Sequence, residues 1–165
     1  MNGAEQVRQV LTEKLKAAGL AAVPAWDRSH MPALQDAVAS VGVCETETNA
    51  AALWNYLGEH WSDRYGTFVE TYGRRLHMEL SVDLYAPKGK RMELERCCDA
   101  VETLCLAPLC EGIRYETVRR GEIGFDRASG YLHCRCTLSA LANFTATRVD
   151  ESALLTDFTL KGVLK

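Results

Sequence analysis

Apolar and polar residues alternate strictly along the segment from Arg74 to Pro87. The apolar positions are Leu76, Met78, Leu80, Val82 and Leu84, and the positions between them are His77, Glu79, Ser81, Asp83 and Tyr85. Successive side chains of a strand point to opposite faces of a sheet, so this pattern predicts a half-buried strand. We expect helices to cover its apolar face, while the other face meets water or a protein partner.

Two segments show the spacing of amphipathic helices. Residues 3–19 carry an apolar stripe of Val7, Val10, Leu11, Leu15 and Ala18, and residues 92–106 carry one of Leu94, Cys97, Cys98, Val101, Leu104 and Cys105. Apolar residues three and four positions apart lie on one side of a helix. Gly19 is a typical end for the first helix, and Pro108 prevents the second from continuing. Both helices are therefore predicted to pack on a sheet by one face.

The remaining patterns predict further strands. These are residues 20–26, 35–45, a hairpin of 113–125 and 131–147 joined by the turn 126–130, and a short terminal strand at 157–164. Gly121 interrupts the outgoing strand of the hairpin and predicts a bulge there. Few helices and a hairpin-rich order of strands indicate an α+β fold, with a mostly antiparallel sheet and two helices packed on one face. The 165 residues fit a single domain, spanning residues 1–165.

The segment from Thr46 to Thr71 has no clear period and reads equally as a short helix or as a long aromatic-rich loop or insertion. Its aromatic residues and the next one along the chain are Trp54, Tyr56, Trp61, Tyr65, Phe68 and Tyr72. Long loops in small domains are usually functional, and exposed aromatic residues are enriched at interfaces. The alternative is that several of these rings close the ends of the core.

Composition narrows the class of protein. The chain is 47% hydrophobic and 25% charged, with a formal net charge of −3, as in an ordinary globular protein. A slightly acidic chain argues against a dedicated nucleic-acid binder, but it suits a channel through which DNA passes without sticking. No apolar run reaches the roughly 18 residues of a membrane helix, and the first residues contain no apolar signal-peptide core. We therefore expect no membrane association and synthesis in the cytoplasm.

The cysteines are predicted to be reduced core residues. There are seven, Cys44, Cys97, Cys98, Cys105, Cys110, Cys134 and Cys136. His133 with Cys134 and Cys136 has the residue types of a zinc site, but a strand would turn His133 away from the two cysteines, and no second cysteine pair follows. The adjacent Cys97 and Cys98 lie deep in a helix rather than in a redox motif at its N-terminus. No metal site is predicted.

Catalytic motifs are absent from the sequence, so we expect no enzyme activity and no cofactor. The basic turn around Lys88 and Lys90 lacks the glycines of a phosphate-binding loop. It either serves solubility or pairs with an acidic rim on a neighbouring subunit. The candidate residues for an assembly interface or lumen face are His77, Glu79, Asp83, Tyr85, Lys88, Lys90, Trp54, Tyr56, Trp61 and Tyr65.

Three stretches carry a resemblance to a known family. They are GRRLHMELSVDLYAP from Gly73, GEIGFDRASGYLHCRCTL from Gly121 and DFTLKGV from Asp157. Together with the N-terminal helix and the cysteine- and leucine-rich helix, this order of elements resembles the tail-terminator and tail-completion proteins of tailed bacteriophages, in the contractile-tail branch. The resemblance covers roughly residues 3–163 as a pattern of elements rather than as a diagnostic motif.

The resemblance implies a structural virion protein, located in the neck region of the tail. Such proteins form a homomeric ring, usually a hexamer, on the head-proximal end of the tail tube. The implied partners are the tail tube protein, the tail sheath protein and neck or connector proteins, with DNA only as a passing occupant of the lumen. Two other functions stay open, a head–tail connector or neck adaptor and, from a different class, a small thiol- or zinc-dependent enzyme.

Overall fold

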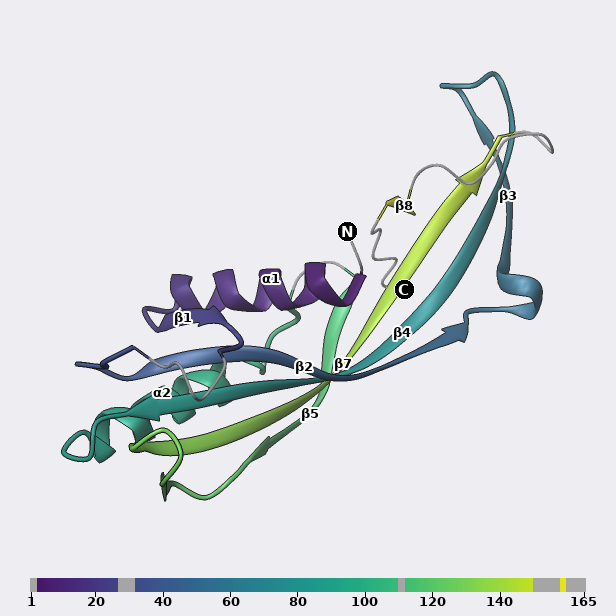
Figure 1. Ribbon diagram of the computed structural model, residues 1–165. Helices are drawn as coiled ribbons and strands as arrows, with labels where there is room; N and C mark the ends of the chain where they lie inside the picture. The colour runs from purple at the N-terminus through teal and green to yellow at the C-terminus, as the bar shows by residue number, and fades with distance from the viewer. Residues whose placement is uncertain (1–2, 27–31, 110–111, 150–157, 160–165) are drawn as a thin grey trace.

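The computed structural model describes residues 3–26, 32–109, 112–149 and 158–159. In this part of the chain, two α-helices accompany one sheet of eight strands (Figure 1). The helices are α1 (Gly3–Ala17) and α2 (Arg91–Leu104), and a short 3₁₀ turn is η2 (Leu53–Asn55). The strands are β1 (Ala21–Pro24), β2 (Val38–Ala50), β3 (Tyr56–Ser62), β4 (Thr67–Ala86), β5 (Ile113–Arg120), β6 (Gly124–Asp126), β7 (Tyr131–Arg148) and β8 (Phe158–Thr159).

The sheet is built around β4, which is 20 residues long. Its neighbours are β2 on one side and β7 on the other, both antiparallel, and the strand order is β1-β2-β4-β7-β5. Of the strands in the described residues, only β1 runs parallel to its neighbour, β2. The short strands β6 and β8 extend the β7 side, while β3 pairs with the first residues of β4. The α+β fold with a mostly antiparallel sheet is confirmed.

The apolar face of β4 forms the core, as its alternation predicts. Leu80 and Leu84 are fully buried in one cluster that also contains Leu11 of α1 and Leu94 of α2. Because β4 and β7 are in register, residues of β7 opposite these leucines face the same way, and Leu138 joins the cluster. Both helices therefore pack on the same face of the sheet. We call the opposite face the outer face.

The end of α1 follows from local chemistry. Gly19 has a φ of 85°, which only glycine adopts at low cost. The Leu20 amide donates to the Leu15 carbonyl at 3.0 Å, so the chain closes the helix and enters β1 two residues after Gly19. In the described part of the chain, no helix is long and apolar enough to cross a membrane.

Residues 46–71 are neither a helix nor a loop, which corrects both readings of this segment. Strand β2 continues to Ala50, η2 follows, and β3 pairs antiparallel with β4, which begins at Thr67. The sequence pattern fails here because this part of the sheet is exposed on much of its surface, so no strict alternation of apolar and polar residues is needed. We call residues 53–73 the arm; they comprise η2, β3, the turn 63–66 and the first residues of β4. Figure 1 shows the arm extending beyond the helices.

The predicted hairpin is also modified. Its return strand is β7, but its outgoing strand is divided into β5 and β6, with Gly121 between them. The Gly121 amide donates to the Arg135 carbonyl at 2.8 Å, and a Cβ on Gly121 would lie 3.0 Å from that oxygen. The register shift of β5 lies earlier, between Tyr115 and Thr117. Of the predicted terminal strand, only Phe158–Thr159 lies within the described residues.

Truncation of a central core side chain should lower stability strongly. Leu80 is fully buried. We expect Leu80→Ala to lower the free energy of unfolding by about 3 kcal/mol, because it removes buried methyl groups and leaves a cavity. Leu106→Ala, at a position that is 87% exposed, is the matched control and should change stability by less than about 0.5 kcal/mol. Urea denaturation measures both values. Equal losses in the two variants would contradict the assigned core.

Candidate assembly surface

The arm exposes an unusual concentration of apolar side chains. They are Leu53, Trp54, Tyr56, Leu57, Trp61, Tyr65 and Phe68. Trp54 is 85% exposed, and Trp61 and Phe68 are more than half exposed. Isolated exposed apolar residues are normal, but a contiguous group of large ones typically marks an interaction site. The predicted candidates Trp54, Tyr56, Trp61 and Tyr65 all belong to this group, which the structure gathers on one projecting element.

One face of the arm carries two ring pairs. The register places Trp61 opposite Phe68 and Tyr56 opposite Tyr72. The ring centroids of these pairs are 5.4 and 5.7 Å apart, with edge-to-face geometry. Residues 68, 70 and 72 of β4 share the face that, further along the strand, meets the helices. The aromatic side chains therefore form one row along the arm, on the same side of the sheet as α1 and α2.

Two carboxylates lie between the ring pairs. Glu59 is directly opposite Glu70, and Arg148 of β7 lies opposite Glu70 on its other side, so the charge of Glu59 is the one without a cation directly opposite it. The Tyr72 hydroxyl donates to Glu70 at 2.8 Å, and this bond raises the pKa of Tyr72. Burial and the charges of Glu59 and Glu70 also raise the pKa of Tyr56. The aromatic row is thus acidic at its centre, a combination suited to binding a cationic side chain.

The turn at the base of the arm is strained. Trp54 has a φ of 55° and Asn55 one of 62°, so both lie in the left-handed region. Asparagine tolerates this region, but for a bulky residue such as tryptophan it is an outlier. Strain of this kind costs on the order of 1 kcal/mol and is concentrated at functional sites. Here it holds an indole ring in solvent rather than in the core.

The outer face carries two positively charged residues on β5, the strand beyond β7. Arg114 and Arg119 of β5 are opposite Leu141 and Thr137 of β7, which places both arginines on the outer face. We call these two residues the basic strip. Among the described residues, Arg120 pairs with Asp99 of α2, whereas Arg114 and Arg119 are exposed and belong to no ion pair. The two arginines are therefore exposed to a partner, on a face that also carries Glu116 beside His77.

Part of the polar face of β4 is buried, which corrects its predicted exposure. Asp83 and Tyr85 are only 8% and 3% exposed, so neither is available as a surface contact. His133 lies 2.7 Å from Asp83, and Arg135 donates two hydrogen bonds to the same carboxylate, at 2.8 and 3.1 Å. The His133 ring stacks on the Tyr85 ring. The Trp26 ring also lies near Tyr85, with the two ring centroids 6.3 Å apart. Pairing across the strands thus turns polar residues into an internal network.

The other candidates of this region remain at the surface. Glu79 is exposed, and half-exposed His77 lies 3.0 Å from Glu116. Lys88 is exposed, with its ammonium 4.2 Å from the centre of the Phe125 ring. Lys90 forms ion pairs with Asp36 and Glu93. The hydrogen bond with Asp36 raises the pKa of Lys90, so this amine is held by its own chain rather than free for a partner.

Three of the described cysteine thiols have the wrong chemistry for nucleophiles. Burial raises the pKa of Cys105 and of Cys134 to about 11. Burial also raises the pKa of Cys97. A catalytic cysteine needs the opposite shift, because the thiolate is the reactive form. These thiols are therefore protonated at neutral pH.

Comparison with known proteins does not place the chain in a group. No protein family matches its sequence, and no curated protein matches it at a significant level.

The buried network predicts a pH-dependent loss of stability. Burial alone would raise the pKa of Asp83, but the hydrogen bonds from His133 and Arg135 outweigh it and lower the pKa from 3.8 to about 2. The ionised carboxylate therefore stabilises the fold above pH 3.8, and this contribution is lost as the pH falls towards 2. Asp83→Asn should lower the unfolding free energy by about 2 kcal/mol at pH 7.

The same variant should differ much less from the wild type near pH 2, because about half of the folded wild-type molecules then have a protonated Asp83 and most of the stabilisation is lost. Urea denaturation at the two pH values measures the difference. Glu79→Gln, which alters an exposed carboxylate on the same face of β4, is the control and should have little effect at either pH. A deficit of Asp83→Asn that stays constant with pH would show that the ionised carboxylate is not the source of the stability.

Proposed function

We propose that this chain is a structural protein, not an enzyme, and that copies of it assemble head-to-tail into a ring on the end of a phage tail tube. The observation that carries the proposal is the pair of complementary surfaces on one chain. The arm presents aromatic rings around Glu59 and Glu70, and the outer face presents Arg114 and Arg119. The order of elements that resembles tail terminators supplies the context for such a ring.

The positions of the two surfaces favour a contact between copies. The arm continues the β2 side of β4, whereas β5 lies beyond β7 on the other side. The aromatic row is on the helix side of the sheet, and the basic strip is on the outer face. The arm of one copy therefore covers β5 of the next, and its own β5 receives the arm of the preceding copy. A contact between two different surfaces repeats around an axis and closes into a ring when the rotation allows it.

The chemistry of the contact is specific. An arginine guanidinium can lie over an aromatic ring while it donates to a carboxylate, and both interactions strengthen when water is excluded. The partner's arginine would pair with exposed Glu59, since Arg148 of the same chain already lies opposite Glu70. Tyrosine, tryptophan and arginine are the residues that most often dominate the binding energy of protein interfaces. A second copy of the chain is therefore the occupant that we assign to the arm.

The role of the ring follows from the resemblance. It caps the head-proximal end of the tail tube, stops its polymerisation and provides the surface for neck or connector proteins. In a contractile tail it also holds the last layer of sheath protein, and DNA passes through its lumen. A hexamer is the expected size, the virion tail is the expected location, and exposed Glu79 and His77 are candidate contacts on the outer face.

Reversal of the basic strip should disrupt the ring. We expect Arg114→Glu with Arg119→Glu to weaken self-association by at least about tenfold, because acidic groups then face Glu59 and Glu70. Adding Glu59→Lys and Glu70→Lys to the same chain should restore association, since the charges are exchanged rather than lost. Sedimentation and native mass spectrometry measure the ring. Lys14→Glu, at an exposed position of α1, is the control and should assemble normally. If the variant with all four substitutions does not assemble, the assigned contact is contradicted.

Truncation of the aromatic row should separate folding from function. Trp61→Ala with Phe68→Ala should leave a folded chain, since both rings are more than half exposed, but should abolish capping of purified tail tubes. Met92→Ala, at an exposed position of α2, should cap tubes as the wild type does. Electron microscopy of tubes mixed with each protein provides the measurement. A wild-type protein that stays monomeric and never binds tubes would refute the proposal, and binding to the portal side instead would indicate a head–tail connector.

A further inference from the structure

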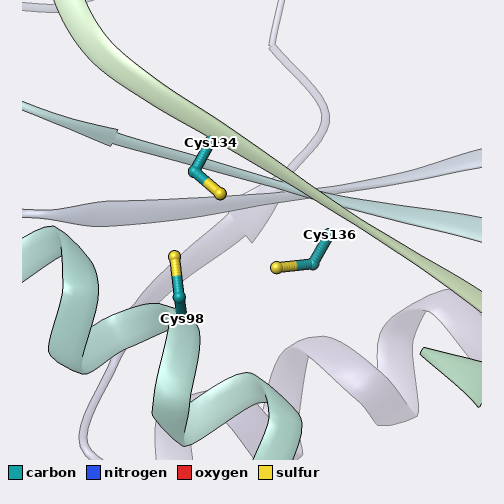
Figure 2. Close-up of side chains that lie close together, drawn as sticks. All are labelled: Cys98, Cys134 and Cys136. Carbon is teal, nitrogen blue, oxygen red and sulfur yellow. The ribbon is translucent and has the colours of Figure 1, made fainter. Parts of the chain in front are cut away.

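Three cysteine thiols converge inside the core. Cys98 comes from α2, and Cys134 and Cys136 come from β7. All three are fully buried, and their sulfur atoms lie within 4.8 Å of one another. Figure 2 shows the three side chains pointing into the space between the helix and the sheet. The cluster is separate from the arm and from the basic strip.

The fold, rather than a short motif, makes this arrangement. Cys134 and Cys136 are two positions apart on a strand, so both point to the helix-covered face. Cys98 is buried on the side of α2 that packs on that face. A metal ion about 2.3 Å from each of three sulfurs, in a planar arrangement, needs roughly 4 Å between the sulfur atoms. The observed separation therefore permits one ion with only small side-chain adjustments.

The surroundings select the kind of ion. Among the described residues, the cluster contains three potential ligands, all of them cysteines, and full burial keeps water away. Zinc in structural sites takes four ligands in a tetrahedron, so it lacks a partner here. Thiolate sulfur is a soft ligand that favours Cu(I), zinc and iron–sulfur clusters, and iron–sulfur clusters, like structural zinc, use four protein ligands. Three sulfurs without water thus suit a three-coordinate, monovalent copper ion.

Positive charge lies beside the cluster. Arg120 acts electrostatically on both Cys98 and Cys134, and its guanidinium is held by Asp99 of α2 at 2.9 Å. A Cu(I) ion with three thiolates carries two net negative charges, and a nearby arginine reduces the cost of burying them. The Cys134 thiol also donates to the Gly121 carbonyl at 3.3 Å, which orients its sulfur. Arg120 therefore offsets part of the cost that burial imposes on thiolates at this point of the core.

We propose that Cys98, Cys134 and Cys136 form a binding site for one Cu(I) ion, which links α2 to β7. Binding displaces the thiol protons to solvent and forms three copper–sulfur bonds, with no change of oxidation state. Because binding releases protons, the affinity should increase with pH. The site does not depend on the proposed ring function.

The test is an anaerobic titration of the full chain with Cu(I) against a chromophoric Cu(I) chelator. To remove the exposed thiol as a competing ligand, the parent protein carries Cys44→Ser. We expect one ion per chain, three sulfur ligands by X-ray absorption spectroscopy, and a melting temperature that rises with copper concentration. Cys98→Ala in this parent should lower the affinity at least about a hundredfold, as expected when one of three ligands is removed. Cys105→Ala, which alters a partly exposed thiol outside the cluster, should retain the site.

Three outcomes would overturn the proposal. They are equal copper binding by the Cys98→Ala protein, coordination of the parent's copper by fewer than three sulfurs, and preferential stabilisation by Zn(II). If Cys98→Ala fails to fold, Cys136→Ala replaces it, and the sulfur count of the parent decides the question without any variant. Copper bound with three sulfurs and lost in either variant would support the site, whatever the result of the ring experiments.

Discussion

The antiparallel pairing of β4 with β7 is the interaction on which the rest of the structure depends. The two strands are paired continuously from Glu70 opposite Arg148 to Ala86 opposite Leu132. This ladder is longer than either helix, so α1 and α2 cover only part of it (Figure 1). A sheet that extends beyond its helices must leave some of its surface in solvent or bury that surface against another molecule. The core and the arm are thus two ends of one ladder with different surroundings.

The two ends use their polar residues differently. At the core end, Asp83 is surrounded by His133 and Arg135 from the paired strand, and the network satisfies a buried carboxylate within the chain. Such a network stabilises the fold but leaves little for a partner to recognise. At the arm end, Glu59 and Glu70 lie opposite each other among exposed aromatic rings, with Arg148 of β7 opposite Glu70 and Glu59 exposed to solvent. This contrast is the physical reason for assigning recognition to the arm rather than to the middle of β4.

The core also contains chemistry that its sequence conceals. Cys134 and Cys136 alone form a pair of apolar residues on a strand, and the addition of Cys98 produces three sulfurs in contact range. The hydrogen bond between the Cys98 and Cys136 thiols and the burial of Cys98 raise the pKa of Cys98 far above its ordinary value. Protonated thiols pack as small apolar groups, so the cluster is compatible with a stable core in the absence of metal. It becomes a ligand set only when a soft ion displaces the protons.

Local patterns determined the elements whose faces have contrasting environments. The alternation around Leu80, the helical spacing around Leu11 and Leu94, and the stop at Gly19 predict the core strand, the two helices and the α+β class, because burial of one face imposes a period on the sequence. The arm lacks that contrast, so its strand β3 could not be recognised, although its aromatic residues were. Tertiary structure alone decided that Asp83 and Tyr85 are internal, that Arg114 and Arg119 share the outer face, and that Cys98 meets Cys134 and Cys136. These relations depend on strand register and helix docking. Both bring together residues that are distant in sequence, so they produce no periodic pattern along the chain.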